Sequence, residues 1–176
     1  MTELIDVLDP ITAEATGRTK PKPQIHRDGD WHRAAHIWII TPDDRVLLQK
    51  RSVAKENHPN MWDVSAAGHV SAGETAAEAA VRETEEEVGI RIDAADLEPI
   101  GTTRESHVLN GGTYIDNEVH EIFLVRRDVD LASLRLQPGE VDDVQLVTFD
   151  QLRKMTARGE LVNHPHEYDL LLSMQD

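Results

Sequence analysis

The segment GHVSAGETAAEAAVRETEEEVGI, residues 68–90, constrains the fold of this chain more than any other stretch. Thr75 and Glu78 have the spacing of a capping box, in which each side chain satisfies the other residue's backbone N–H at the start of a helix. Gly89 is placed to end that helix in a left-handed conformation. Five residues between these ends repeat at helical spacing and predict one buried face: Ala77, Ala80, Val81, Thr84 and Val88. The segment therefore predicts a loop followed by a half-buried helix.

The other side of this helix concentrates carboxylates. Glu83, Glu86 and Glu87 stand at positions i, i+3 and i+4, so a helix places them on one face, opposite the apolar stripe and outside the core. Only a hard cation, an arginine or bound protons can relieve repulsion among three clustered carboxylates. Oxygen ligands suit Mg²⁺ or Mn²⁺, which keep open positions for a phosphorylated substrate. A solvated, exposed helix face is the alternative interpretation of such a run.

Composition limits the possible partners. The chain has 33 acidic and 18 basic residues, which argues against a broad nucleic-acid-binding surface because phosphate backbones require the opposite balance. A small anionic substrate remains compatible if metal ions or a few cations offset the field. The absence of cysteine excludes disulfides and cysteine nucleophiles. The sequence shows neither an apolar run of roughly 20 residues nor a signal-peptide pattern, so we expect a cytoplasmic protein without membrane or nucleic-acid partners.

The rest of the chain predicts further strands and helices around a mixed sheet. Strands are expected at residues 3–8, 32–40, 46–52, 104–109, 113–125 and 144–149, with residues 10–24 as a loop or an exposed hairpin. Asn110-Gly111-Gly112 is a strong hairpin signal between two of these strands. Asp150 is expected to cap a helix over residues 150–159, and the tail predicts one more helix.

The spacing of the acidic segment resembles the signature of a known family. Gly68, five residues, Glu74, seven residues and then Arg82-Glu83-x-x-Glu86-Glu87-x-Gly89-Ile90 looks like the Nudix box of enzymes that hydrolyse nucleoside diphosphates linked to another group. Thr84 is the one departure, since an aliphatic residue is usual there. The resemblance implies an α/β fold, the Nudix fold, with a mixed β-sheet in an α/β/α sandwich.

We expect one Nudix domain over residues 1–176, because the chain has an ordinary domain length and shows neither a linker nor an internal repeat. Within it, residues 1–31 are expected to form an N-terminal extension, residues 32–150 the core and residues 151–176 a C-terminal helical segment.

The resemblance also implies roles for the box residues. The implied catalytic set is Glu74, Arg82, Glu83, Glu86 and Glu87. The three carboxylates Glu83, Glu86 and Glu87 would hold Mg²⁺ or Mn²⁺, with the backbone carbonyl of Ala67 as a further ligand. Glu74 and Arg82 would form an orienting ion pair, and Gly68 and Gly73 would let the loop approach the helix closely. The general base stays open among Glu83, Glu86 and Glu118.

Residues 26 to 125 resemble in particular the Nudix branch that includes the isopentenyl-diphosphate isomerases. Those isomerases need a cysteine just before the first box glycine, where this chain has Ala67, and typically keep only part of the box glutamates. Both departures favour hydrolysis. The resemblance implies that Arg51 and Lys55 grip a diphosphate and that Glu118 faces the substrate. It also implies a second metal site formed by His26, His32, His69, Asp116 and Glu118, with satisfied structural histidines as the alternative.

We therefore expect a metal-dependent hydrolase that cleaves a phosphoanhydride bond in a nucleoside di- or triphosphate or another small diphosphate compound, by attack of water on phosphorus. A non-catalytic nucleotide-binding Nudix module is the alternative, and an isomerase is a more remote one. Downstream of the box the chain reads TTRESH, without the proline usual in ADP-ribose hydrolases or the tyrosine favoured by dinucleoside-polyphosphate hydrolases. The expected partner is a small phosphorylated molecule, and the sequence leaves the oligomeric state open.

Overall fold

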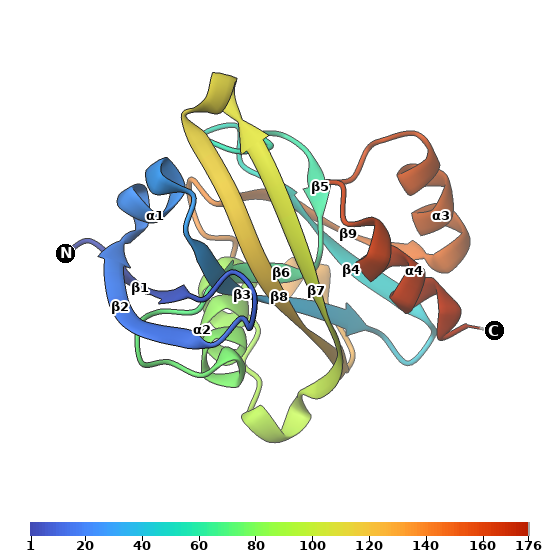
Figure 1. The fold of residues 1–176 in the computed structure, drawn as a ribbon. Helices are drawn as coiled ribbons and strands as arrows, with labels where there is room; N and C mark the ends of the chain where they lie inside the picture. The colour runs from blue at the N-terminus through green and yellow to red at the C-terminus, as the bar shows by residue number, and fades with distance from the viewer. Residues whose placement is uncertain (176) are drawn as a thin grey trace.

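The computed structural model describes residues 1–175 and consists of a mixed β-sheet with helices on both sides (Figure 1). Its strands are β1 (Leu4–Leu8), β2 (Ala15–Pro21), β3 (Trp31–Ile40), β4 (Arg45–Arg51), β5 (Trp62–Asp63), β6 (Ala66–His69), β7 (Glu98–Leu109), β8 (Tyr114–Arg126) and β9 (Val141–Thr148). Its helices are α1 (Lys22–Asp28), α2 (Ala76–Val88), α3 (Phe149–Ala157) and α4 (Pro165–Ser173), with short 3₁₀ turns at Ala94–Asp96, Asn110–Gly112 and Leu131–Ser133.

Strand β3 is the centre of the sheet. It pairs in parallel with β8 along its whole length and antiparallel with β6, β1 and β4. Ala35, Ile37 and Ile39 face the apolar cluster under α2, whereas Trp38 and Ile40 face a second cluster under α3 and α4. This continuous burial on both faces is typical of a central strand. The α/β/α arrangement predicted from the sequence is confirmed, with α2 and the α3–α4 pair covering opposite faces (Figure 1).

The face of the sheet that meets α3 and α4 changes from polar to apolar along β3 and β8. Trp38 and Ile40 sit at its apolar end, while His32 and His36 occupy the same face toward the start of β3. The parallel register pairs His32 with Glu118 and Ala34 with His120 on β8. Because successive strand residues alternate between faces, these polar side chains gather at one end of the sheet. That end forms the floor of the candidate site.

Helix α2 follows the sequence prediction closely. Thr75 and Glu78 form the capping box, and Gly89 ends the helix with a φ of 75°. Within the predicted stripe, Ala80, Thr84 and Val88 are buried, while Ala77 and Val81 are partly buried against the same cluster. The Thr84 hydroxyl donates to the carbonyl of Ala80 at 2.7 Å, so the one departure from the box pattern buries no unpaired hydroxyl.

The N-terminal residues form more regular structure than predicted. Residues 10–24 supply the turn and the second strand of an antiparallel hairpin, since β1 pairs with β2, and the region ends in the unpredicted helix α1. Pro23 signalled a loop, yet proline is well tolerated in the first turn of a helix, where N–H groups lack partners. Ile5 and Ile25 are fully buried, so this extension packs against the remainder of the fold.

The C-terminal part confirms two predictions and corrects a third. The Asn110–Gly112 turn joins β7 and β8 in an antiparallel pair, and the tail contains α4. Asp150 does not cap α3, because the helix begins one residue before it. Thr148 accepts from the backbone N–H of Gln151 and forms the capping box, while Asp150 forms an exposed ion pair with Lys154.

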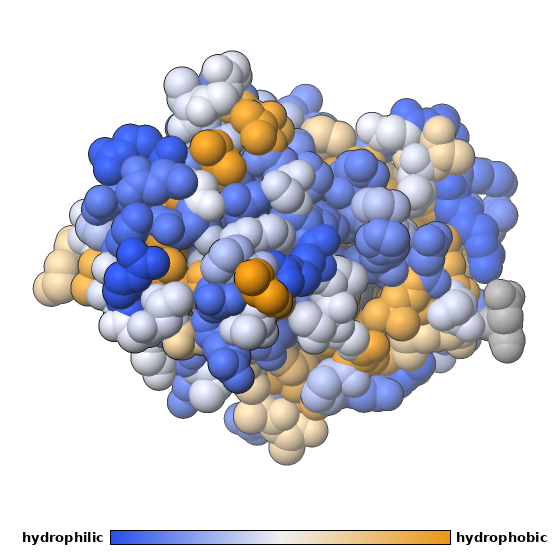
Figure 2. All heavy atoms as spheres, in the orientation of Figure 1, coloured by the Kyte–Doolittle hydropathy of each residue, from blue (hydrophilic) through white to orange (hydrophobic). Residues whose placement is uncertain are grey.

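The face of the molecule seen in Figure 2 is predominantly polar. Figure 2 shows hydrophilic residues over most of the visible face, with apolar residues in small separate groups. No helix within residues 1–175 combines the length and the apolar character needed to cross a membrane.

Candidate active site

A polar cleft of about 300 Å³ opens between the box segment, the start of β8 and the loop after β4. Carboxylates, histidines and a few cations line it, among them Arg51, Lys55, His69, Arg82, Glu83, Glu86, Glu87, Asp116 and Glu118. These include most residues that the sequence predicted for the site, although they come from five different elements or loops. The volume is at the lower end of the range of small-molecule sites.

The close approach of the loop to α2 is confirmed at Gly68. A Cβ atom there would lie 2.1 Å from Cδ of Glu83, so only glycine leaves space for this carboxylate. Gly73 has a different role from the predicted one. A Cβ atom at Gly73 would meet nothing within 4 Å, but the φ of +80° is a conformation that glycine adopts without strain. Gly73 therefore serves the turn itself.

Glu74 and Arg82 form the predicted ion pair. Arg82 donates from Nε to Glu74 Oε1 at 2.9 Å and from Nη2 to Glu74 Oε2 at 2.8 Å, which is the two-pronged geometry of a strong pair. The same guanidinium donates to the carbonyl of His69 at 3.1 Å and to Glu83 Oε1 at 2.6 Å. Arg82 thus ties the loop, the helix and the Glu83 carboxylate together.

The three box glutamates differ in exposure. The side chain of Glu86 is 47% exposed and that of Glu83 is 13% exposed, whereas Glu87 is buried. The prediction that all three stay outside the protein interior is wrong for Glu87. Polar groups make its burial possible, because Gln49 donates its amide to Glu87 Oε2 at 2.5 Å and the backbone N–H of Ala67 lies 3.4 Å from Oε1.

Burial also changes the protonation of these carboxylates. Burial raises the pKa of Glu83 to about 7, against the lowering effect of Arg82. Burial, reinforced by the charge of Glu83, raises the pKa of Glu87 to about 8. A negative charge at either position is therefore disfavoured by the protein alone. A divalent cation bound to these oxygens would supply the missing compensation, so the donor set fits a hard metal ion.

The two predicted diphosphate-binding cations both line the cleft. Each also has acceptors within the protein. Arg51 donates to the carbonyl and side-chain oxygens of Asn57, at 3.0 and 2.7 Å, and lies 3.3 Å from Asp63. Lys55 forms an ion pair with Glu140. A diphosphate would therefore share or displace these contacts.

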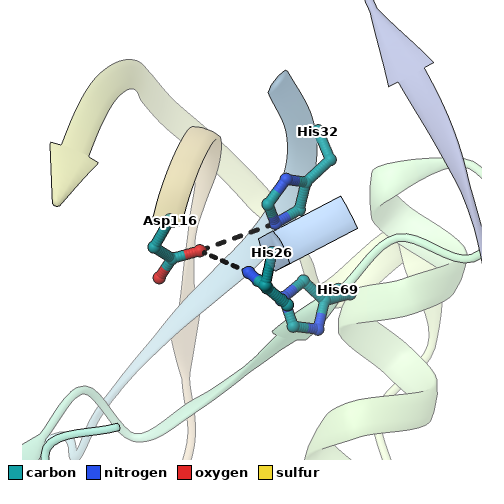
Figure 3. Close-up of side chains that lie close together, drawn as sticks. All are labelled: His26, His32, His69 and Asp116. Atoms are coloured by element: carbon teal, nitrogen blue, oxygen red, sulfur yellow. Dashed lines mark ion pairs between the residues drawn. The ribbon is translucent and has the colours of Figure 1, made fainter. Parts of the chain in front are cut away.

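A group that we term the outer histidine cluster consists of His26, His32, His69 and Asp116 (Figure 3). One ligand atom from each lies within 4.8 Å of all the others. Asp116 Oδ1 is 3.4 Å from His26 Nδ1 and 3.6 Å from His32 Nε2. Glu118 flanks the group, with Oε1 3.2 Å from His69 Nε2. The structure thus brings together all five residues predicted for a second metal site.

The chemistry of the outer histidine cluster fits a metal ion. Among residues 1–175, neither His32 Nε2 nor Asp116 Oδ1 has a hydrogen-bond partner, although both are buried. The other ring nitrogen of His32, Nδ1, lies 3.0 Å from the Asp30 carbonyl and must donate to it, so Nε2, 3.4 Å from Glu118 Oε1, is the nitrogen that faces the cluster. Burial lowers the pKa of His26 to about 4 and that of His69 to about 3, so both imidazoles are neutral near pH 7. Neutral imidazole is the form that binds metals.

A second buried group was not predicted as a site. His36, His120, His164 and Glu167 also place ligand atoms within 4.8 Å of one another, directly behind the cleft; we term them the inner cluster. His36 lies on β3, His120 on β8, and His164 and Glu167 at the start of α4, so sequence spacing relates only the last two. Only the alternation of Asp116, Glu118 and His120 along β8 was a usable signal, because it placed His120 on the cleft side of its strand.

Comparison with known proteins agrees with this geometry. The model of the NUDIX domain family matches residues 30–166. The chain belongs to the Nudix family. The match covers strands β3 to β9 and the box helix but not β1, β2 or α1, so the resemblance seen in the box extends over the larger part of the chain.

Curated Nudix relatives include hydrolases and more distant isomerases. Nudix hydrolase 3 of Arabidopsis thaliana is 38% identical over 94% of this chain, which spans only 22% of that relative's length. An uncharacterized Nudix hydrolase of Listeria monocytogenes is 34% identical over 85% of this chain and 82% of its own length. Isopentenyl-diphosphate Delta-isomerase 1 of Aromatoleum aromaticum is 33% identical over 84% of this chain and 76% of its own length.

The fold is shared with solved Nudix-type structures. DR0079 of Deinococcus radiodurans aligns with a TM-score of 0.73 over 96% of this chain and 97% of its own, at 22% sequence identity. The structural match shows a common fold, and at this low sequence identity it shows nothing more. The family model and the relatives named Nudix hydrolases together place this chain among the Nudix hydrolases.

Proposed function

We propose that this Nudix enzyme is a metal-dependent hydrolase of phosphoanhydride bonds in a small diphosphate compound, with nucleoside di- and triphosphates as the first candidates. The observation that carries the proposal is the convergence of Glu83, Glu86 and Glu87 on one wall of the cleft. Two of these carboxylates have pKa values raised by burial, so their ionised forms need a cation. Structural roles alone do not explain such a costly arrangement.

The metal proposed at the box is Mg²⁺ or Mn²⁺. The ligands would be Glu83, Glu86, Glu87 and the backbone carbonyl of Ala67, an all-oxygen set that these ions prefer. Bound there, the metal supplies polarisation of the bridging phosphates and lowers the pKa of the attacking water. Arg82 positions Glu83 through its 2.6 Å hydrogen bond, and Glu74 in turn holds Arg82.

The proposed reaction is attack of water on phosphorus. A new P–O bond forms, the bridging P–O bond breaks, and the leaving phosphate departs with the bonding electron pair. A carboxylate accepts the proton of the water, and we take Glu86 as the first candidate because its side chain is the most exposed of the three box glutamates, at 47%, and could use one oxygen for the metal and the other for the proton. Arg51 and Lys55 would stabilise the negative charge on the phosphate groups.

Hydrolysis is favoured over isomerisation even though isomerases are among the relatives. The isomerase resemblance implies a cysteine where this chain has Ala67, and the chain has no cysteine anywhere. The box glutamates are also complete. Ala67 lines the cleft beside Gly68 and Glu87, so no thiol stands at the place where the isomerase chemistry requires one.

A second divalent metal is proposed at the outer histidine cluster, with Glu118 as a further ligand. Support comes from the two unpartnered buried atoms, His32 Nε2 and Asp116 Oδ1, and from the neutral state of His26 and His69. Nitrogen donors in this set favour Mn²⁺ or Zn²⁺ over Mg²⁺. An ion here would offset part of the negative charge of this acidic cleft and so assist binding of an anionic substrate.

The test follows products by ³¹P NMR. The full-length protein is incubated with nucleoside di- and triphosphates, ADP-ribose and isopentenyl diphosphate, in the presence of Mg²⁺ or Mn²⁺. We expect phosphate or pyrophosphate release that requires metal and falls by at least about 100-fold in Glu86→Gln. Glu85→Gln is the matched control, because Glu85 is an exposed neighbour on another side of α2 and pairs with Arg91.

The other outcomes distinguish the alternatives. Metal and nucleotide binding without turnover of any compound would favour a nucleotide-binding module. Conversion of isopentenyl diphosphate to its double-bond isomer without phosphate release would favour an isomerase. Equal activity of Glu86→Gln and Glu85→Gln would contradict the mechanism.

A further inference from the structure

The inner cluster is a buried polar group that the proposed hydrolysis does not use. His36 comes from β3, His120 from β8, and His164 and Glu167 from the start of α4. All four are at least nine-tenths buried, and Glu105 of β7 and Asp63 of β5 adjoin them. His36, Glu105 and His164 reach the wall of the cleft, so the group is accessible to a small ion from that side.

Two atoms in this group point at each other without a bond between them. His120 Nδ1 and Glu105 Oε1 are buried, lack any hydrogen-bond partner among residues 1–175, and lie 3.9 Å apart. His120 Nδ1 is also 3.9 Å from Glu167 Oε2. This separation is too long for a hydrogen bond. Buried polar atoms normally have partners, so a shared partner between them is expected.

We propose that the inner cluster binds one divalent transition-metal ion of the Zn²⁺ type. The ligands are the Nδ1 atoms of His36, His120 and His164 together with the carboxylate of Glu167, and Glu105 supplies a further oxygen. Three imidazoles select Zn²⁺ or a similar ion over Mg²⁺ and Ca²⁺. This site is separate from the box and from the outer histidine cluster, and it does not depend on the hydrolase mechanism.

The contacts of Glu167 with two of the histidines bracket the spacing that such an ion requires. Metal–nitrogen bonds of about 2.0–2.1 Å place two ligands of a tetrahedral ion about 3.3 Å apart. In the inner cluster, Glu167 Oε2 is 2.9 Å from His36 Nδ1 and 3.9 Å from His120 Nδ1, values on either side of that spacing. His164 Nδ1 is 2.9 Å from Glu105 Oε2. Metal binding would replace the proton now shared in each of these histidine–carboxylate contacts.

The groups that orient metal ligands are already in place. Metal-bound histidines usually donate their second ring N–H to a carboxylate. His120 Nε2 lies 2.8 Å from Glu118 Oε2, and His164 Nε2 lies 3.3 Å from Asp63 Oδ1. The indole N–H of Trp38 donates to Glu167 Oε1 at 2.8 Å and fixes that carboxylate. Nδ1 is therefore the nitrogen of His120 and His164 that is left for the cluster, and His36 directs its Nδ1 at Glu167.

The alternative without metal is a network of protonated histidines and carboxylates. In that network His36 pairs with Glu167, and His164 pairs with Glu105 and Asp63, but His120 Nδ1 and Glu105 Oε1 stay unpartnered. The metal accounts for these two atoms and the network does not. The two interpretations differ in whether Zn²⁺ or Co²⁺ binds at these imidazoles, which can be measured directly.

The experiment uses the whole 176-residue chain, stripped of metal, saturated with Zn²⁺ and then freed of unbound ion by gel filtration. The number of Zn²⁺ ions bound per chain is measured by elemental mass spectrometry. The proteins compared are wild type, His164→Gln, Glu167→Gln and His166→Gln. His166 is the matched control, because it is an exposed histidine of the same helix. We expect His164→Gln and Glu167→Gln to hold one Zn²⁺ per chain fewer than wild type and His166→Gln. Counting differences removes the contribution of the other two sites.

A second measurement keeps the test valid if a buried variant misfolds. Ring-nitrogen NMR spectra of ¹⁵N-histidine-labelled wild type are recorded with and without Zn²⁺. We expect large shifts of Nδ1 in His36, His120 and His164, with Nε2 of His120 and His164 still protonated. The proposal is overturned if these three Nδ1 signals do not respond to Zn²⁺, or if folded His164→Gln binds as much Zn²⁺ as His166→Gln.

Discussion

Ionisation of Glu87 conflicts with its surroundings, because this carboxylate is buried beside the charge of Glu83. Its pKa is about 8 in the folded chain, above the ordinary 4.5. The folded state therefore binds a proton that the unfolded state has released, and stability falls as pH rises between these values. In metal-free protein we expect Glu87→Gln to gain stability relative to wild type over this range, by on the order of a few kcal/mol at pH 8.

Urea unfolding of both proteins at several pH values with a chelator measures this difference. Below pH 4.5 the two curves should nearly coincide, since Glu87 is then protonated in both states. Glu85→Gln is the control, because the Glu85 carboxylate is exposed and pairs only with exposed Arg91. A wild-type protein that becomes more stable than Glu87→Gln as pH rises would show that another cation compensates Glu87.

The loop between β6 and α2 illustrates the element scale, because one glycine determines where a box carboxylate lies. In Gly68→Ala the new methyl group would meet the carboxyl end of Glu83, which is flexible and can move away. We therefore expect a small stability loss of about 1 kcal/mol but a fall in kcat of at least about tenfold, because Glu83 leaves its position beside Arg82.

Gly73→Ala supplies the contrasting variant. Its methyl group meets nothing, but its φ of +80° strains any other residue. It should lower the stability by about 1 kcal/mol while affecting kcat less than Gly68→Ala does. Melting temperatures and kcat values of the two variants, measured under the same conditions, show whether Gly68→Ala loses more activity than its loss of stability explains. If both variants lose activity in proportion to stability, Gly68 has no specific role in placing Glu83.

Elements with local sequence signals were predictable and those without were not. The capping box of α2, the end at Gly89 and the hairpin turn at Asn110–Gly112 each depend on a few adjacent residues. Helix α1 was missed because its prolines signal a loop, although they suit a first helical turn. The predicted cap of α3 was wrong because Thr148 and Asp150 both carry side chains that can cap a helix. Only the position at which β9 ends selects Thr148.

At the scale of the whole molecule, the same distinction applies to the candidate site. The box residues lie within one short segment, so the family resemblance implied the Glu74–Arg82 ion pair, whereas the hydrogen bond from Arg82 to Glu83 was not predicted. The inner cluster joins His36 to Glu167 across 131 positions, and no pattern in one sequence relates residues that far apart. The burial of Glu87 was equally hidden, because it depends on Gln49 of a separate strand.

The outer histidine cluster connects the N-terminal extension to the sheet, since His26 lies on α1 while His32, His69 and Asp116 lie on β3, β6 and β8. A metal bound there would link α1 to three strands. We expect Mn²⁺ or Zn²⁺ to raise the melting temperature and to slow amide hydrogen exchange in residues 22–28. At a free metal concentration of 100 Kd the stabilisation would be about 2.7 kcal/mol.

His26→Gln should abolish the slowing of exchange in α1, whereas Arg27→Gln should retain it, because Arg27 is an exposed neighbour on the same helix. The location of the effect distinguishes this site from the inner cluster, whose ligands lie on β3, β8 and α4. An ion at the inner cluster alone would therefore protect α4 in both variants and leave α1 unchanged. Protection of α1 that persists in His26→Gln would mean that the extension is fixed by packing of Ile5 and Ile25 without help from the metal.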